Sequence, residues 1–277
     1  MDTGLLIPRQ PYHMLLTEQY TKKIVLEYGI SHFYECRVSN GVSEIKTSVP
    51  DGCIDVMFYW STDYRKMGAD VIGTLLQPHA VKVHSGYHYF GVRFLPGQRF
   101  LFDDTPFSEM VEHAIPLQDQ PENHALIEKI AMAADFESRI AAFMAFYLPK
   151  YLADKSNAAM DGISHHMLQE ILNRRGNVKI SEMAESMGYS ERYVSRMFAE
   201  KTGIAPKKFC RIIRFQNALQ EIEEKCIGHY ELCDISEIGY YDEAHFIHDF
   251  KTFSGQSPVK FVNDLKQERM IERLKIL

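Results

Sequence analysis

Two arginines and a serine lie at helical spacing and could read the edges of nucleic-acid bases. Arg192, Ser195 and Arg196 are three and four positions apart, so a helix would present them on one outer face. A guanidinium can donate two parallel hydrogen bonds to guanine, and a hydroxyl can bond several base edges. Val194 and Phe198 would point to the opposite, core side. The pattern predicts base recognition in a DNA major groove.

A short helix and a turn should position that face. The apolar stripe of the preceding helix consists of Ile180, Met183, Ala184 and Met187. Gly188 can adopt the left-handed backbone that ends this helix, and Ser190 can cap the next one. These features predict a helix-turn-helix. The alternative is a pair of amphipathic helices in an ordinary bundle, which leaves the combination of cationic and small residues on the outer face unexplained.

The pattern occurs twice, which indicates a tandem unit. Phe198, Gly203 and Pro206 recur as Phe250, Gly255 and Pro258, each displaced by 250 − 198 = 52 positions. Pro206 should open a long helix, 207–224, between the two copies. Its first turns carry three cations that we expect to contact phosphates: Lys207, Lys208 and Arg211.

The doubled unit resembles the DNA-binding domain of AraC/XylS-type bacterial transcription regulators. Both copies end in Gly-x-x-Pro, and the stretch GYYDEAHFIHDFKTFSGQSP is similar to the signature of that family. The resemblance implies base contacts at Arg192, Ser195 and Arg196, which the 52-residue offset carries to Ala244, Ile247 and His248. Glu243 could accept a hydrogen bond from cytosine or could cap its helix.

The charge distribution separates the two copies. The formal net charge is −6, yet residues 176–214 hold eight Lys and Arg against four acids, whereas residues 226–264 hold two Lys against seven acids. The second copy is also one residue shorter between Ser236 and Gly239, which would rotate the following helix by about 100°. We therefore expect the first unit to supply most of the DNA affinity.

The first 120 residues indicate β-structure. Runs rich in β-branched and aromatic residues are separated by turn formers, at 22–28, 32–38, 54–60, 80–83 and 87–94. This spacing is typical of a barrel or sandwich. The segments PDGCIDVMF and HYFGVRFLPG resemble the sensor region of one subgroup of these regulators, and this resemblance implies a cupin-like barrel. The expected fold class is therefore α+β, with an N-terminal β-barrel and an all-α C-terminal domain.

One strand of this region is apolar on both faces. Val56 and Phe58 alternate with Asp55 and Tyr59, which predicts a core on one side and a cavity or covering helix on the other. Arg93 lies between apolar residues of a later strand. Either it binds an anionic ligand together with Asp55 and Tyr59, or it lies on a solvent face or pairs with Asp51 or Asp55.

Residues suited to catalysis or metal binding are scarce. His84 and His88 share a strand face in the predicted strand but would stand about 13 Å apart, too far to hold one ion. The five cysteines are irregularly spaced, without a Cys-x-x-Cys pair. Cys53 lies near carboxylates that would raise its thiol pKa, so a buried structural role fits better than reactivity. We expect neither an enzyme, nor a metal, nor a cofactor.

Helical spacing begins near residue 122. Two helices are predicted, the second ending near Pro149, and they could cover the barrel or mediate a homodimer. The small-residue stretch 155–162 suggests a linker between an effector-sensing domain, 1–155, and a double helix-turn-helix domain, 162–277. The tail 261–277 should form an amphipathic helix. No apolar run reaches the ~18 residues of a membrane span, and the N-terminus does not look like a secretory signal, so a cytoplasmic protein is expected.

These features predict a regulator that binds double-stranded DNA. The resemblance adds an unknown small-molecule effector, RNA polymerase as a second partner, and activation as the commoner mode. Two alternatives stay open: a ligand-independent regulator whose N-terminal half is a protein-interaction module, and a barrel enzyme fused to a DNA-binding domain.

Overall fold

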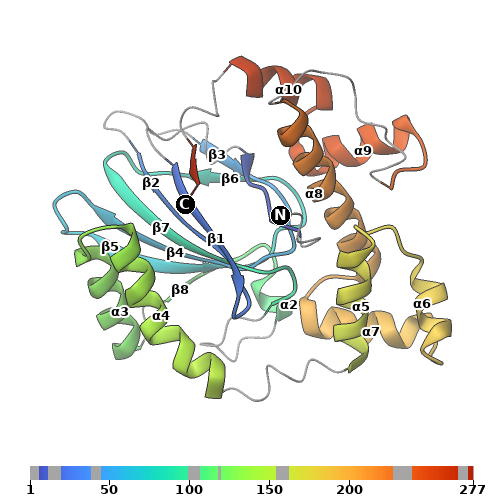
Figure 1. Ribbon diagram of the computed structural model, residues 1–277, viewed down its shortest axis with the longest axis horizontal. Helices are drawn as coiled ribbons and strands as arrows, with labels where there is room; N and C mark the ends of the chain where they lie inside the picture. Colours follow the sequence, from blue (N-terminus) through green and yellow to red (C-terminus); the bar gives the residue numbers. More distant parts are fainter. Residues whose placement is uncertain are drawn as a thin grey trace.

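The computed structural model describes residues 6–11, 20–38, 45–98, 107–117, 120–153, 162–226, 239–267 and 274–276. An N-terminal sheet is followed by a C-terminal helical part, so the fold is α+β (Figure 1). The strands are β1 (Tyr20–Glu27), β2 (Ile30–Arg37), β3 (Ile45–Ser48), β4 (Asp55–Ser61), β5 (Met67–Ile72), β6 (His79–Lys82), β7 (Tyr87–Phe94), β8 (Ala114–Pro116) and β9 (Leu274–Ile276). The helices are α2 (Phe107–Met110), α3 (Pro121–Met132), α4 (Phe136–Ala153), α5 (Gly162–Asn173), α6 (Ile180–Ser186), α7 (Glu191–Thr202), α8 (Pro206–Cys226), α9 (Glu243–Ser254) and α10 (Pro258–Gln267).

The main sheet is open, which corrects the expected barrel. Its strands are hydrogen-bonded in the order β8-β5-β4-β7-β2-β1-β9, and β3 pairs with β6 in a separate two-stranded sheet. Within the described residues the edge strands β8 and β9 do not pair with each other, so the sheet does not close on itself. The short β8 and β9 were missed by the strand predictions, as were β3 and β5.

One face of this sheet is covered by helices. Val56, Phe58 and Trp60 of β4 lie in one core cluster with residues of α3 and α4, among them Ile130 and Phe143. In Figure 1 the two helices lie together on one side of the sheet. The expected core side of β4 is therefore confirmed, because alternate residues of a strand face opposite sides of the sheet.

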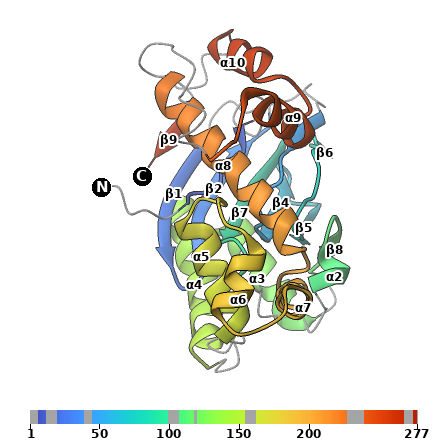
Figure 2. The same cartoon turned by 90° about the vertical axis from the view of Figure 1, so that its right-hand side faces the viewer.

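The C-terminal helices pack against the loop before β4 and against the N-terminal segment through close contacts. A Cβ atom at Gly52 would lie 2.7 Å from Cε2 of Phe209, and Gly52 has a φ of +75°, so both space and backbone favour glycine there. Leu6 and Val49 belong to the same buried cluster as Phe209 and other residues of the C-terminal helices. Figure 2 shows α8 passing in front of the sheet. The two parts of the molecule therefore share one core.

The C-terminal helices form around α8 as their apolar spacing predicts. Phe209, Ile212, Ile213 and Leu219 are all fully buried. α5 ends before Gly176, whose φ is +78°. α7 packs on the start of α8 through Phe198 and Phe209, and α9 packs on the first half of α8, where Asp249 and Phe253 contact Arg211 (Figure 1).

Two helix predictions were wrong in detail. α4 continues through Pro149 to Ala153, because Pro149 is on the exposed side and the carbonyl it leaves without a donor belongs to exposed Ala145. The C-terminal tail is not one helix over 261–277: among the described residues α10 ends at Gln267, and Leu274–Ile276 pairs in parallel with β1. The segment 154–161, which contains most of the expected linker, lies outside the described residues.

Candidate nucleic-acid interface and sensor pocket

α7 presents the predicted base-reading residues on its outer face. Ser190 caps the helix by accepting a hydrogen bond from the backbone of Tyr193, and Gly203 ends it with a φ of 72°. Val194 and Phe198 are fully buried and fix the rotation of the helix. As a result Arg192 and Arg196 are exposed and Ser195 is half-buried.

Few interactions within the protein restrain Arg196. Its side chain is 64% exposed, lies 3.9 Å from a carboxylate oxygen of Glu200, and is centred 5.7 Å from the ring of Tyr193. Tyr193 stacks on Tyr189 with ring centroids 5.2 Å apart. An exposed ion pair of this length contributes little to stability, so the guanidinium is available to DNA.

α9 repeats this construction with different chemistry. Asp242 caps it by accepting from the backbone of His245, and Gly255 ends it with a φ of 79°. Glu243 is therefore not the cap, which removes one of its two suggested roles. The remaining residues equivalent to the α7 contacts are placed as follows: Ala244 and His248 are exposed and Ile247 is half-buried.

The turn before α9 contains a residue that sequence comparison of the two copies missed. Only Tyr189 separates Gly188 from its cap in the first unit, whereas Tyr240 and Tyr241 separate Gly239 from Asp242 in the second. Tyr241 is 94% exposed. The signal for this extra residue was in the sequence: Gly188 and Gly239 are 51 positions apart, whereas the caps Ser190 and Asp242 are 52 positions apart. The shortened stretch before Gly239 lies outside the described residues.

The three cations expected on phosphates have different surroundings. The Lys207 side chain is 75% exposed and pairs with Glu191 at 2.7 Å. Lys208 is half-buried over the ring of Phe253, and burial lowers the pKa of its ammonium group. Of these two lysines, Lys207 is the more accessible to an approaching phosphate, which would compete with Glu191 for its ammonium group.

Arg211 joins α8 to α9 instead of facing outward. Its Nε and Nη2 atoms donate to Oδ1 of Asp249 at 3.2 and 2.7 Å, and its guanidinium is centred 5.4 Å from the Phe253 ring. Asp249 is 1% exposed. The other carboxylate oxygen of Asp249 lies 3.6 Å from Nε2 of His245. The pair fixes the second recognition helix on the long helix.

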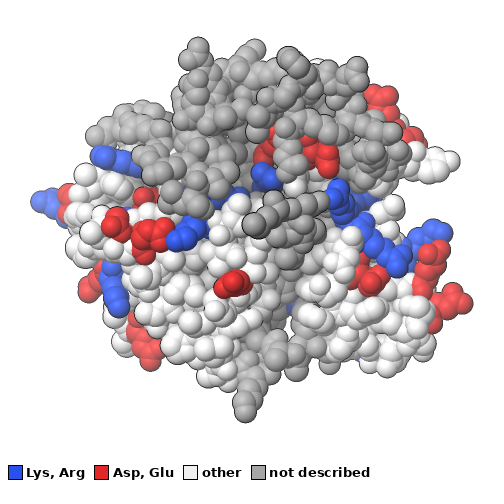
Figure 3. Space-filling view, in the orientation of Figure 1, with Lys and Arg blue, Asp and Glu red and all other residues white. Residues whose placement is uncertain are grey.

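Basic and acidic side chains are mixed over the helical part of the molecule. Figure 3 shows Lys and Arg beside Asp and Glu on the right-hand side of the face it displays. Such a surface attracts phosphate less strongly than a uniformly basic one. We therefore expect specific contacts from α7 to carry more of the DNA affinity than a general positive field.

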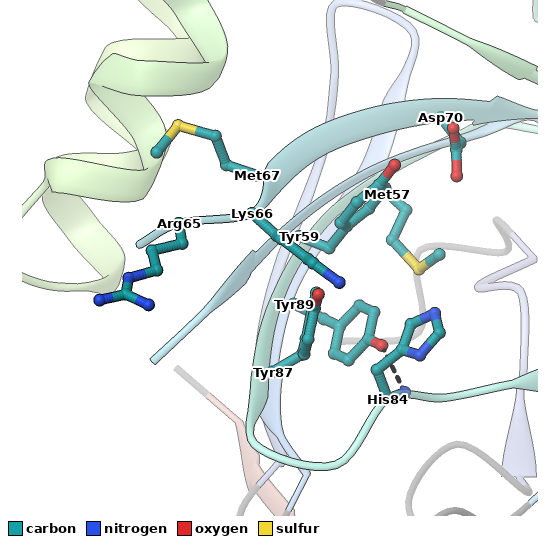
Figure 4. A pocket seen from close by; sticks show the side chains of 9 residues that line it. All are labelled: Met57, Tyr59, Arg65, Lys66, Met67, Asp70, His84, Tyr87 and Tyr89. Atoms are coloured by element: carbon teal, nitrogen blue, oxygen red, sulfur yellow. Dashed lines mark hydrogen bonds between the residues drawn. The ribbon is translucent and has the colours of Figure 1, made fainter. Parts of the chain in front are cut away.

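A cavity of about 480 Å³ opens on the sheet face away from α3 and α4. Figure 4 shows the side chains around it. Its walls come from β4, β5, β7 and adjoining turns, and the main contributors are Met57, Tyr59, Lys66, Asp70, Tyr87 and Tyr89. The expected cavity side of β4 is thus confirmed, and Tyr59 lies in it.

Arg93 and Asp55 occupy a buried ion-pair cluster beside this cavity. Arg93 donates to Asp51 and, at 2.8 Å, to Asp55. Tyr34 donates to the same Asp55 oxygen at 2.6 Å. Neither Arg93 nor Asp55 lines the cavity. Of the two interpretations of Arg93, the structure shows the ion pair, and it does so with both of the suggested carboxylates.

Burial sets the protonation of this cluster. Burial raises the pKa of the Tyr34 hydroxyl well above its usual range, so Tyr34 remains a donor. Burial also raises the pKa of the Cys53 thiol, and nearby Asp51 adds to the effect, which agrees with a structural cysteine. A Cβ atom at Gly91 would lie 2.0 Å from Cζ of Tyr34, so the absence of a side chain at Gly91 lets the Tyr34 ring lie over the neighbouring strand β7.

His84 and His88 do not share a strand face. His84 precedes β7 and contributes to the cavity, whereas His88 stacks on Trp60 with ring centroids 5.6 Å apart. In the described residues no group of three His, Cys, Asp or Glu side chains is arranged to hold a metal ion. Among the helices the structure describes, none is long and apolar enough to cross a membrane.

Comparison with known proteins places both parts of the chain. Residues 183–264 match the family of helix-turn-helix domains, and residues 22–116 match a domain of unknown function, DUF6597. An uncharacterized HTH-type transcriptional regulator of Staphylococcus aureus is 28% identical over 112 residues, 40% of this chain and 14% of that protein. The Msm operon regulatory protein of Streptococcus mutans is 19% identical over 141 residues, half of each chain.

The chain thus covers at most half of the length of these two relatives. Among solved structures, ToxT from Vibrio cholerae aligns over 89% of this chain and 98% of its own, with 10% identity and a TM-score of 0.42. That score is too low to transfer any property to this chain. The helix-turn-helix match and the doubled, capped units identify a helix-turn-helix domain in the C-terminal part, similar to the domains of the named HTH-type transcriptional regulators.

Proposed function

We propose that this regulator is a cytoplasmic, sequence-specific transcription activator controlled by a small molecule bound in the N-terminal cavity. The observation that carries the proposal is the continuity between cavity and DNA-binding helices. Met57, Tyr59 and Tyr87 of the cavity pack in one cluster with Tyr20 and Tyr34. Tyr34 bonds the Asp55–Arg93–Asp51 cluster, which lies next to α8.

Two polar side chains complete the connection to α8. Gln10 donates to Asp51 at 2.9 Å and to the carbonyl of Val49 at 2.7 Å. Gln216 of α8 donates to the carbonyl of Pro50 at 2.8 Å. A ligand that shifts the tyrosines would therefore act on the helix that spaces α7 from α9. Binding would shift the population toward arrangements that fit both helices into successive major grooves.

The resemblance to AraC-type regulators supports the remaining parts of the proposal: activation, contact with RNA polymerase, and a homodimer. Exposed and half-buried residues on the outer faces of α7 and α9 would contact bases, namely Arg192, Ser195, Arg196, Glu243, Ala244, Ile247 and His248. Lys207 would contact a phosphate. Arg93 and Asp55 would act on the ligand indirectly, through the cluster beside the cavity, and Tyr59 directly.

The proposal is tested by selecting genomic fragments with the purified protein and measuring the salt dependence of binding to the enriched site. Arg196→Ala should weaken binding by about 1–3 kcal/mol, the discrimination expected of a bidentate contact. Arg174→Ala is a matched control, because Arg174 is a 65% exposed arginine directly after α5 that also pairs with a glutamate four residues earlier, Glu170.

The same site tests which unit dominates. Because α7 lies in the basic half of the domain, His248→Ala should weaken binding less than Arg196→Ala. An intact Arg196→Ala complex together with loss of binding in His248→Ala would contradict this assignment. Failure to enrich any fragment, with and without metabolite extracts, would contradict sequence-specific binding itself.

A further inference from the structure

The cavity on the open sheet face is walled by flat rings. Tyr59 and Tyr87 have ring centroids 6.5 Å apart, Tyr87 and Tyr89 6.4 Å, and His84 and Tyr87 5.1 Å. Tyr89 is held in place because its hydroxyl accepts from the backbone of His84 at 2.9 Å. An aromatic ligand could add a further stacked or edge-to-face contact to these rings, which is the arrangement that aromatic pairs favour.

The strand register leaves room for such a partner above Tyr59. Gly68 of β5 is paired directly with Tyr59, and Met57 is paired with Asp70. Since directly opposed residues lie on one face and Gly68 has no side chain, no side chain of β5 lies beside the Tyr59 ring at this register position. The thioether of Met57 provides a polarizable floor next to it (Figure 4).

Two cations, Arg65 and Lys66, line the cavity, and they point in different directions. The ammonium group of Lys66 extends among Tyr59, Tyr87 and His84, whereas the neighbouring Arg65 points away (Figure 4). Arg65 is 86% exposed and lies 3.5 Å from Asp63. In the part of the chain that the structure describes, no carboxylate forms an ion pair with Lys66, although the charge of Asp63 acts on it from farther away, so an anionic ligand would give Lys66 a direct partner.

A carboxylate lies at the other end of the cavity. Asp70 is four residues beyond Lys66, so the two backbones stand about 13 Å apart, a distance that the lysine side chain shortens. Burial raises the pKa of Asp70, and within the described residues no side chain donates a hydrogen bond to it. A ligand hydroxyl or amine would satisfy this oxygen pair.

We propose that the cavity binds a planar aromatic carboxylate that carries a hydroxyl or amino group at the end opposite its acid. The carboxylate pairs with Lys66, the ring lies against Tyr59 and Tyr87, and the distal donor bonds Asp70. A sugar would use the rings and Asp70 but would leave Lys66 without a counter-charge. An organic cation would use the rings but would be repelled by Lys66. The proposal rests on the proposed function, since it names the effector class.

Isothermal titration calorimetry on the full chain tests the class. The probes are hydroxy- and aminobenzoates and hydroxyphenylacetates, each beside its amide, its cyclohexane analogue and its ring without the distal donor, with glucose and choline for the two rival classes. At least one aromatic carboxylate should bind with a dissociation constant below about 1 mM, and its amide should bind at least tenfold more weakly.

Variants locate the binding. Lys66→Met should weaken the carboxylate at least tenfold and leave the weak binding of its amide unchanged. Lys23→Met, which removes a cation of β1 that pairs with Glu137 and does not line the cavity, should change the affinity less than twofold. Asp70→Asn should remove the advantage of probes with a distal donor over probes without one. Equal thermal midpoints for the variants show that the fold is kept.

Three results would overturn the proposal: no aromatic carboxylate binding, equal affinity in wild type and Lys66→Met, or preference for glucose or choline. The proposed function is judged separately by operator binding. A carboxylate that binds at Lys66 without changing operator affinity would leave the ligand class standing and contradict control by the cavity. An operator response to a different class of molecule would do the reverse.

Discussion

Arg211 and Lys207 lie one helical turn apart at the start of α8, but they have different surroundings. Removing Arg211 would leave the Asp249 carboxylate buried without its donor, so Arg211→Ala should destabilise the protein by about 3 kcal/mol. Lys207→Ala removes an exposed pair and should cost less than about 1 kcal/mol.

Denaturant unfolding measures both losses of stability. The salt dependence of operator binding measures how many phosphate contacts each variant loses. Lys207→Ala should lower the slope by about one phosphate contact. If instead Arg211→Ala leaves stability unchanged and lowers the slope, Arg211 contacts DNA and its pairing with Asp249 is incidental.

Lys22 makes the free energy of unfolding depend on pH. It is 9% exposed, and burial, followed by the charge of Arg9, lowers its pKa to about 7, while Glu223 opposes the shift. An unfolded lysine titrates near 10.4, so between pH of about 7 and 10 the unfolded chain binds more protons than the folded one. The contribution of Lys22 therefore becomes less unfavourable as pH rises through this window.

Lys22→Met should consequently be more stable than wild type at pH 7, by roughly 1–4 kcal/mol, with the difference shrinking toward pH 10. Urea unfolding at several pH values measures this difference. Lys23→Met is the matched control, because Lys23 faces the other side of β1 and pairs with Glu137. A difference independent of pH would show that Lys22 keeps an ordinary pKa in the folded state.

At the scale of elements, each recognition helix begins at its own capping side chain, Ser190 for α7 and Asp242 for α9. Ser190→Ala removes the acceptor for the Tyr193 amide and should cost about 1 kcal/mol. Ser181→Ala is a suitable control: Ser181 is exposed on α6, makes no hydrogen bond to any described residue, and its loss should stay within about 0.5 kcal/mol. Equal thermal midpoints for the two variants would mean that α7 is held by packing alone.

Local elements could be predicted from the sequence because their signals are local. The cap at Ser190, the buried stripe of α8 and the two faces of β4 follow from spacings within one element. The open sheet could not be predicted, since it depends on which strands occupy the edges. The helix that contains Pro149 was predicted to end there, because the sequence of one helix does not show that this proline lies on the exposed side.

The site was predictable to a similar limit. Helical spacing placed Arg192 and Arg196 outward, but Arg211 satisfied the same criterion and turned inward to Asp249, 38 residues away. The partners of Arg93 are 42 and 38 residues distant, so sequence left open whether it bound a ligand or its own chain. The sequence did not indicate Lys66 or Asp70 as site residues. Lys66 lies in the turn before β5 and Asp70 lies within β5, a strand that was not predicted.

At the scale of the molecule, Gln216 links the sheet to the DNA-binding helices. Its fully buried side chain accepts from the backbone of Arg9 and donates to the carbonyl of Pro50, each at 2.8 Å. Gln216→Leu leaves these backbone groups unpaired, so the single calorimetric transition expected of a shared core should shift down and broaden. A loss of about 1–3 kcal/mol is expected.

Scanning calorimetry of Gln216→Leu beside Gln169→Leu, an exposed position of α5, separates the interface from the substitution itself. If both variants melt like wild type, the two parts are not coupled through Gln216. The affinity of the cavity for its ligand should be unchanged in Gln216→Leu, whereas the effect of that ligand on operator binding should weaken.

The parallel pairing of β9 with β1 brings together residues at opposite ends of the chain. Lys22 is paired with Ile276, 276 − 22 = 254 positions later. At a synthesis rate of about 5–20 residues per second, β1 emerges from the ribosome roughly 13–50 s before its partner is made. During that interval its outer backbone groups have no strand beside them, and an unpaired edge can join another chain. Newly made copies on one messenger should therefore be most prone to aggregate before their last strand is synthesised.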